Sequence, residues 1–215
     1  MVIEDAIVNE VKTLQKTEIG KEVRHRIQEF ESFKHKPSQD WFSELCFCLL
    51  TANAKFKTAF AIQQELGHEG FMHSSLPELV DCIRRNKHRF HNNKAKFIVA
   101  ARNYVNIKNK INNILKKEGE AAAREWLVKN IKGLGYKESS HFLRNTGCKT
   151  LAIIDRHILS VLKSFNIIKQ KPETVTKKIY LKLEKKLQHI AQQLKMSAAE
   201  LDLYLWYMKT GNVLK

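Results

Sequence analysis

The chain has 215 residues, and 43% of them are hydrophobic, which is enough for a packed core and excludes a wholly disordered protein. It carries 38 lysines and arginines against 22 acidic residues, a formal net charge of +16. We therefore expect a polyanionic partner, either a nucleic acid or an anionic membrane surface. No apolar run approaches the ~20 residues of a spanning helix, and the N-terminus lacks a signal peptide, so a cytoplasmic location is expected.

Apolar residues recur at helical spacing along the chain, and long alternating strand patterns are absent. With only 3 prolines and 8 glycines, the sequence predicts an all-α fold. The first helices are expected at about residues 3–17, starting with Ile3, and at about 20–34.

A third, apolar helix is expected to open at Pro37 and to end in the sequence Thr-Ala-Asn, of which Asn53 is the last residue. From local chemistry alone, Asn53 is a helix C-cap or turn residue. A helix of about residues 55–66 should follow and stop at Gly67, and a short helix should begin near Pro77.

The four cysteines have a spacing that fits neither a zinc site nor a disulfide framework. Cys46 and Cys48 lie within the apolar third helix, so they are predicted to be core residues.

The segment from Asn86 to Lys96 is basic and carries one aromatic residue. Such a charge run is usually a solvated face. An Arg-Phe tip on a basic turn is also what a DNA wedge requires, because the ring stacks on exposed bases and arginine binds phosphate or base edges. His88, Arg89 and Phe90 are therefore candidate DNA contacts.

A helix–turn–helix unit is predicted at about residues 123–147. Its turn holds Gly133 and Gly135, which can adopt positive φ and let a ligand approach the backbone. The turn leads into a helix N-terminus, where unpaired N–H groups and the helix dipole attract an anion. Lys132 beside the turn indicates that this anion is a phosphate. The flanking helices are expected at about residues 94–105 and 119–131.

Lys137 falls in the first turn of the second helix of this unit. A cation there opposes the helix dipole, at a cost of roughly 0.3–1 kcal/mol. Lys132 and Arg144, which are near in sequence, disfavour the ammonium form further, so the neutral amine is available as a nucleophile. The competing interpretation is a solvated lysine that contacts phosphate.

Asp155 stands at the start of a helix that is expected to run to about residue 164. Taken alone, it would be an N-cap. The lysine-rich segment of about residues 169–186 is predicted to be a solvated face that attracts DNA diffusely.

The last helix begins with the capping-box sequence Ser197-Ala-Ala-Glu200. Asp202 and Trp206 then lie one turn apart on the same face. Trp206 is either a core residue or a platform that stacks on an extruded base.

The sequence G-L-G-Y-K, followed by I-I-D-R-H, resembles the helix-hairpin-helix DNA glycosylase superfamily. In its bifunctional members a lysine after the hairpin attacks the sugar and an aspartate at the next helix start assists, and the matching positions here are Lys137 and Asp155. The resemblance implies one unit over residues 1–215, with two helical lobes and DNA in a central cleft. It places Asn53 in the gap left by a flipped base.

In this superfamily the hairpin can also hold a structural monovalent cation. By resemblance, the main-chain carbonyls of Lys129, Ile131 and Leu134 would bind it here. No catalytic metal and no cofactor are implied.

Four stretches of the chain carry a more specific resemblance: R-I-Q-E-F-x-S-F, E-L-C-F-C-L-L-T-A-N, G-Y-K-E-x-S-H-F-L-R-N and the ending D-L-Y-L-W-Y-x-x-T-G-x-V-L-K. Together they resemble the compact archaeal-type (type 2) 8-oxoguanine DNA glycosylase family. The resemblance implies that Trp206 stacks on the damaged base and that His141 lines its other face. Asp202 and the carboxylate of Lys215 would read the base edges. The DNA-binding set would be completed by Lys132, Gly133, Gly135 and His157.

The expected activity is therefore excision of 8-oxoguanine from duplex DNA through a lysine Schiff base, followed by β-elimination that nicks the strand. The expected location extends to the nucleoid, because the basic chain lacks targeting signals, and the resemblance implies a monomer. The alternatives are a glycosylase for another oxidised base, a helix-hairpin-helix DNA-binding protein without activity, and a membrane-surface protein, against which the hairpin argues.

Overall fold

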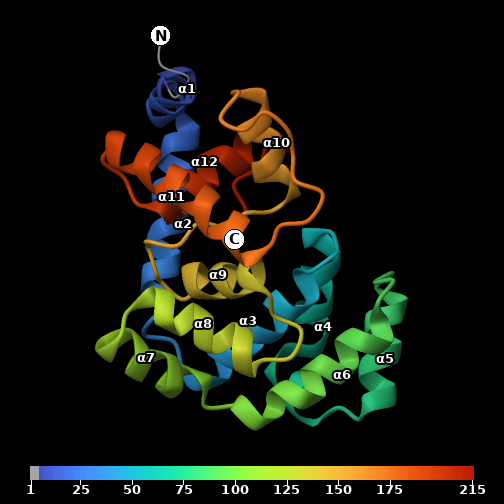
Figure 1. Ribbon diagram of the computed structural model, residues 1–215. Coiled ribbons are helices and arrows are strands. Elements are labelled where there is room, and N and C mark those ends of the chain that lie inside the picture. Colours follow the sequence, from blue (N-terminus) through green and yellow to red (C-terminus); the bar gives the residue numbers. More distant parts are fainter. Residues whose placement is uncertain (1–4) are drawn as a thin grey trace. The chain divides into compact units, whose positions relative to one another are not determined.

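The computed structural model describes residues 5–215, and every regular element in that range is a helix (Figure 1). The all-α expectation is confirmed. Ile3, where the first helix was expected to start, lies outside the described residues. The chain divides into two compact units: unit 1 takes the chain up to Lys34 and from Leu143 onward, and unit 2 is His35–Phe142.

Unit 2 is built around one apolar helix, α3. Its members are α3 (Ser38–Thr51), α4 (Phe56–His73), α5 (Leu76–Arg85), α6 (His91–Ala101), the 3-10 helix η1 (Arg102–Tyr104), α7 (Ile107–Lys117), α8 (Glu120–Asn130) and the first part of α9 (Tyr136–Asn145). Helix α3 packs against α4, α6 and α7, so its residues from Leu45 to Leu50 are fully buried. Fixing α3 in this way fixes the position of its C-terminal turn.

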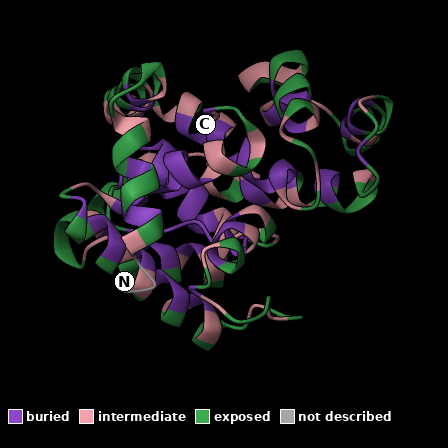
Figure 2. Cartoon of the chain, turned by 90° about the horizontal axis from the view of Figure 1, so that it is seen from above, coloured by how far each residue is buried: buried purple, intermediate pink, exposed green. Residues whose placement is uncertain are grey.

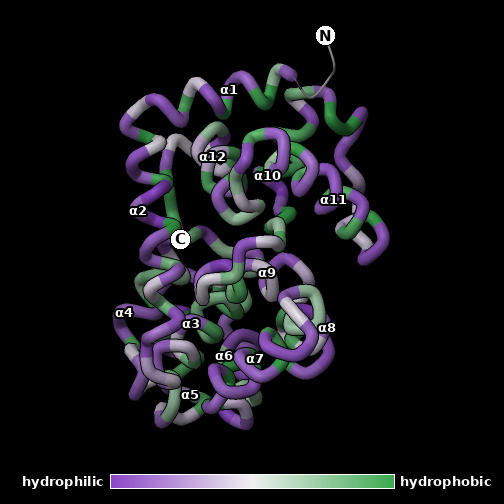
Figure 3. Tube along the Cα trace, turned by 90° about the vertical axis from the view of Figure 1, so that its left-hand side faces the viewer, coloured by the Kyte–Doolittle hydropathy of each residue, from purple (hydrophilic) through white to green (hydrophobic). Residues whose placement is uncertain are grey.

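Unit 1 is organised around the last helix, α12, which packs against α1, α2, α10 and α11. Its helices are α1 (Asp5–Gln15), α2 (Glu18–Phe33), α10 (Arg156–Ser164), α11 (Lys177–Gln193) and α12 (Ala198–Thr210). Figure 3 shows hydrophilic and hydrophobic residues alternating along α1 and α2, as expected for helices that bury one face. The side chain of Ser197 caps α12 by accepting the Glu200 N–H at 3.1 Å.

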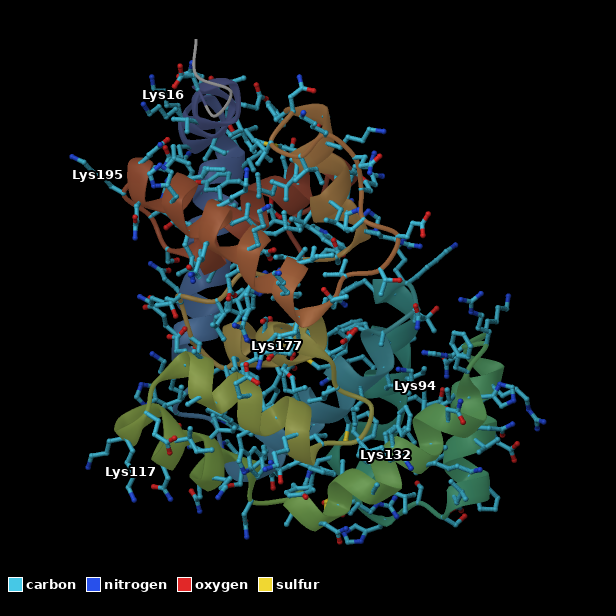
Figure 4. All side chains as sticks on the ribbon, viewed as in Figure 1. Lys16, Lys94, Lys117, Lys132, Lys177 and Lys195 are labelled. Atoms are coloured by element: carbon cyan, nitrogen blue, oxygen red, sulfur yellow. The ribbon has the colours of Figure 1, made fainter. Side chains whose placement is uncertain are left out.

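The lysine-rich segment of unit 1 is largely solvated, as predicted. Six of its lysines are exposed: Lys169, Lys171, Lys177, Lys178, Lys182 and Lys185. Figure 4 shows Lys195, just beyond α11, extending away from the ribbon in the same manner.

Two helical features differ from the expectation. Gly67 does not end the fourth helix; it adopts φ 57° and ψ −164° and kinks α4, which resumes and reaches His73. Helix α7 was not among the expected helices, although Ile107, Ile111 and Ile114 are buried at helical spacing.

All four cysteines are buried, with at most 5% of any one exposed, which confirms the prediction for Cys46 and Cys48. Figure 2 colours the buried residues purple, and they lie on the inner sides of the helices. Within residues 5–215, no cluster of three or more His, Cys, Asp or Glu is arranged to hold a metal ion. In the same range, no helix is both long and apolar enough to cross a membrane.

Candidate active site

The hairpin between α8 and α9 is a closed turn packed on α6. The Leu134 N–H donates to the Ile131 carbonyl at 3.2 Å. Gly133 adopts φ +98°, and a Cβ at this position would lie 2.4 Å from Cδ2 of Phe97 on α6. Only glycine meets both conditions, so the sequence-predicted role of Gly133 has a physical basis here.

The start of α9 presents backbone N–H groups beside two exposed cations. Lys129 at the end of α8 and Lys132 in the turn are both exposed, and Lys132 is labelled in Figure 4. A helix N-terminus with positive side chains beside it suits a phosphate. The Gly135 N–H donates to Oε2 of Glu138 at 3.3 Å, which caps this end of the helix.

Lys137 is the second residue of α9, in the first turn as predicted. Its side chain is only 24% exposed, so it is largely covered by protein rather than freely solvated. Its Nζ lies 3.8 Å from Oε1 of Glu138, whose side chain is 15% exposed.

The remainder of α9 turns its apolar face into the core. Ser139 and Phe142 are fully buried, and the ring of Phe142 meets Trp41 edge-on at 5.9 Å. His141 is 7% exposed, and its ring lies edge-on to Phe47 at a centroid distance of 5.9 Å. Contact of His141 with a base stays a prediction.

Asp155 is the N-cap of α10, in unit 1. The N–H groups of His157 and Ile158 both donate to its Oδ1, at 2.7 and 2.9 Å. Because both bonds end on the same oxygen, the cap leaves Oδ2 for other chemistry. The two roles that the sequence offered, cap and catalytic carboxylate, are therefore compatible.

Trp206 is half-buried on α12 and faces the start of α10. The ring of His157 lies edge-on to the indole at a centroid distance of 4.8 Å. Among residues 5–215, no acceptor binds the buried Nε1–H of Trp206. This tryptophan is therefore held in place on one side without being fully enclosed, and His157 is one of the residues that hold it.

Asp202, which was expected to read a base edge, is 5% exposed and forms a buried ion pair with Arg144. Arg144 also donates from Nε and Nη2 to Oδ1 of Asn145, at 3.1 and 3.0 Å. A carboxylate held by a buried guanidinium is costly to redirect, so this geometry favours a structural role for Asp202.

The end of the chain is anchored in unit 1. Val213 is 3% exposed, and Lys215 is half-buried. The role assigned to the Lys215 carboxylate stays a prediction, as does a cation on the hairpin carbonyls.

The basic turn before α6 exposes only part of the predicted DNA contact set. Arg89 is exposed and Phe90 is 37% exposed, with the guanidinium carbon 4.5 Å from the ring centroid. His88, by contrast, is 2% exposed. Its Nδ1 accepts the Phe90 N–H at 3.2 Å, so its Nε2 carries the hydrogen and donates to the Leu50 carbonyl at 3.0 Å. His88 therefore shapes the turn from beneath and is not placed to touch DNA.

Asn53 is exposed and adopts φ 61°, just beyond the end of α3. This left-handed conformation is the turn geometry that asparagine tolerates well. Asn53 thus occupies a turn and still presents its amide to solvent.

Lys94 belongs to this region, and no functional role was assigned to it from the sequence. Lys94 on α6 is 4% exposed, and its Nζ donates to the carbonyl of Leu49 in the last turn of α3. Burial lowers the pKa of Lys94 to about 8, the charge of Glu138 raises it and the charge of Lys137 lowers it. In the sequence Lys94 looks like any other member of a basic run, so nothing local signalled its burial.

Comparison with known proteins identifies the relatives of this chain. Residues 23–196 match the family model described as 8-oxoguanine DNA glycosylase. The chain is 45% identical over 209 residues to the 8-oxoguanine DNA glycosylase/AP lyase of Methanocaldococcus jannaschii, covering 97% of this chain and 99% of that protein.

Solved structures agree with the sequence match. The structure of the M. jannaschii 8-oxoguanine glycosylase/lyase in complex with a 15mer DNA containing 8-oxoguanine has a TM-score of 0.93 at 44% identity, covering 98% of this chain and all of that one. The 8-oxoguanine DNA glycosylase of Thermotoga maritima has a TM-score of 0.89 at 37% identity, covering 99% and 100%. The hairpin with its following lysine, the capping aspartate and these matches together place the chain in the 8-oxoguanine DNA glycosylase family.

Proposed function

We propose that this protein excises 8-oxoguanine from duplex DNA and then cleaves the resulting abasic site as an AP lyase. The observation that carries the proposal is Lys137, a largely covered lysine in the first turn of the helix that follows the Gly133 hairpin. Family membership supports the substrate, since the relatives bear the name 8-oxoguanine DNA glycosylase/AP lyase. We also propose that it acts as a monomer on chromosomal DNA.

Binding of DNA combines three features of the chain. The net charge of +16 attracts the phosphate backbone. The start of α9, with Lys132, holds one phosphate near the lesion. Phe90 stacks against the bases that are exposed when the damaged nucleotide leaves the DNA helix, and Arg89 binds them. Extrusion of the nucleotide costs a few kcal/mol.

The chemistry begins with the neutral amine of Lys137, which attacks C1′ of the extruded nucleotide as the bond to the base breaks. Oδ2 of Asp155 stabilises the developing positive charge on the sugar and accepts the proton that the amine loses. The sugar ring then opens to a Schiff base on Nζ. Loss of a C2′ proton from this intermediate expels the 3′ phosphate and nicks the strand, and water releases the lysine. Trp206 supports the extruded base by stacking.

The test is borohydride trapping on duplexes that differ in one nucleotide: 8-oxoguanine, guanine, or an oxidised pyrimidine. Reduction of the Schiff base leaves a stable protein–DNA adduct. We expect an adduct with the 8-oxoguanine duplex and none with the guanine duplex.

The other outcomes each remove a different part of the proposal. An adduct mainly with the oxidised pyrimidine would retain the lysine chemistry and change the substrate. Tight DNA binding with no adduct on any duplex would leave a DNA-binding protein without lyase activity.

A further inference from the structure

The segment that leads into Asp155 is buried but belongs to no helix. Residues 151–154 are irregular in conformation, and none of them is more than 6% exposed. Buried backbone N–H and C=O groups need hydrogen-bond partners. Because every regular element in residues 5–215 is a helix, no strand in that range can supply them. Side chains must therefore do so.

Helix α11 provides these side chains. The hydroxyl of Tyr180 donates to the Ala152 carbonyl at 2.8 Å and accepts the Ile154 N–H at 3.3 Å. The Ala152 N–H donates to Oε1 of Glu184 at 3.0 Å. Tyr180 and Glu184 are buried, at 2% and 5% exposure. They are one helical turn apart, so they lie on the same face of α11.

A third side chain on this face extends the contact toward the start of the segment. Gln188, one turn beyond Glu184, donates from Nε2 to the Thr150 carbonyl at 2.8 Å. We call Tyr180, Glu184 and Gln188 the α11 clamp. Its bonds run along α11 and along the segment in opposite directions, so they fix the register of the segment. The bond nearest the active site ends on the residue immediately before Asp155.

We propose that Tyr180 and Glu184 are positioning residues for catalysis: they hold the backbone of residues 152–154 and so fix the place of the Asp155 carboxylate. The inference rests on the proposed function, in which Asp155 acts on the sugar. It assigns a part in the reaction to two buried side chains that act only through Asp155.

The N-cap of α10 constrains the carboxylate from one side only. It joins Oδ1 to the N–H groups of His157 and Ile158, which follow Asp155 in the chain. The clamp supplies the constraint from the other side, because Asp155 has φ −113° and ψ −177° and continues the extended path of the segment. Together the two constraints fix Oδ2. A displacement of about 1 Å at a reacting group can lower a rate roughly 10²-fold.

The competing role for the clamp is a purely structural one. Removal of the Tyr180 hydroxyl takes a partner from two buried backbone groups, which lowers stability whether or not catalysis is affected. A double-mutant cycle distinguishes the two roles. A residue that acts through the Asp155 carboxylate has no further effect on the rate once that carboxylate is removed, whereas a general packing defect affects both backgrounds equally.

The experiment measures single-turnover excision of 8-oxoguanine by the full chain, with saturating protein, at a temperature where every variant is folded. Tyr180→Phe, Glu184→Met and Glu184→Gln are each made in wild type and in Asp155→Asn. The matched control is Tyr204→Phe, which also removes one buried hydroxyl from unit 1. Tyr204 is 0% exposed, and its hydroxyl has no hydrogen-bond partner among residues 5–215. Melting temperature and DNA affinity are measured on the same preparations.

We expect Tyr180→Phe to lower the excision rate by about 10–100-fold, with DNA affinity close to that of wild type. Glu184→Met should act in the same direction, because it removes the acceptor of the Ala152 N–H. Glu184→Gln keeps an oxygen at that place and should retain most of the rate. In the Asp155→Asn background, Tyr180→Phe should change the remaining rate by less than about twofold. Tyr204→Phe should match its parent in both backgrounds.

A wild-type rate for Tyr180→Phe would overturn the inference. Equal fold-losses in the two backgrounds would also overturn it, because the clamp would then be structural. Equal losses in Glu184→Gln and Glu184→Met would remove Glu184 from the positioning role. If wild type excises no 8-oxoguanine, the proposed function fails; if wild type excises it and the effect of Tyr180→Phe does not depend on Asp155, only this inference fails.

Discussion

Replacement of Asp155 by asparagine or by alanine separates its two tasks. The cap consists of two N–H donors on Oδ1, from His157 and Ile158. Asparagine keeps an oxygen at that position and is as good an N-cap as aspartate, so the melting temperature of Asp155→Asn should stay within about 1 °C of wild type. Alanine removes the cap, which costs about 1 kcal/mol, equivalent to a fall of about 2–4 °C for a chain of this size.

The excision activity should depend on the negative charge of the Asp155 carboxylate and not on the N-cap hydrogen bonds. Both variants lose the carboxylate, so single-turnover excision of 8-oxoguanine should fall by about 10²–10⁴-fold in each. Calorimetry and a gel-based excision assay on the same preparations, with DNA affinity as a control, give the two readouts. Near-normal excision by Asp155→Asn would show that Asp155 is only a cap, and an equal loss of stability in both variants would refute the capping geometry.

Three further outcomes are expected. Lys137→Gln should form no borohydride adduct while binding a lesion duplex with nearly wild-type affinity in an anisotropy titration; an undiminished adduct would remove the lysine from its role. Phe90→Ala should weaken binding to lesion DNA by about 1–3 kcal/mol with no change in melting temperature, because the ring is partly exposed, and an unchanged Kd would count against stacking. Burial lowers the pKa of His88, so below about pH 6.5 the unfolded chain takes up a proton that the folded chain resists. The urea midpoint of wild type should therefore fall more between pH 7.5 and 5.5 than that of His88→Gln, and parallel declines would contradict the assignment.

Local signals predicted most of the hairpin and its surroundings correctly. Glycines at a turn, a lysine one residue into a helix and an aspartate before an apolar stripe each have a short-range cause, so Gly133, Lys137 and Asp155 could be placed from sequence. A helix break is a weaker signal. Gly67 was expected to end a helix, but a positive φ only interrupts one turn, and the residues beyond the glycine decide whether the helix resumes.

Side chains whose roles depend on distant partners could not be predicted in this way. His88 and Lys94 read as surface members of a basic run, yet both bind carbonyls of α3 about 40 residues earlier in the chain, Leu50 and Leu49. From the sequence, Asp202 was interpreted as a polar residue one turn from Trp206. Its ion pair is instead with Arg144, which lies 58 positions earlier in the chain. Burial of a charged residue is a property of the assembled core, which a local pattern does not encode.

The burial of all four cysteines has a consequence if the protein acts, as proposed, on oxidised guanine. Oxidants attack the thiolate of an accessible cysteine far faster than a protonated, enclosed thiol. Burial raises the pKa of Cys46, and it raises that of Cys82 to about 11, so both stay protonated under cellular conditions. Cys48 and Cys148 are likewise sheltered, at 0% and 5% exposure. The protein should therefore resist sulfenylation under the oxidative stress that generates 8-oxoguanine, its proposed substrate, and native samples should consume almost no thiol reagent until they unfold.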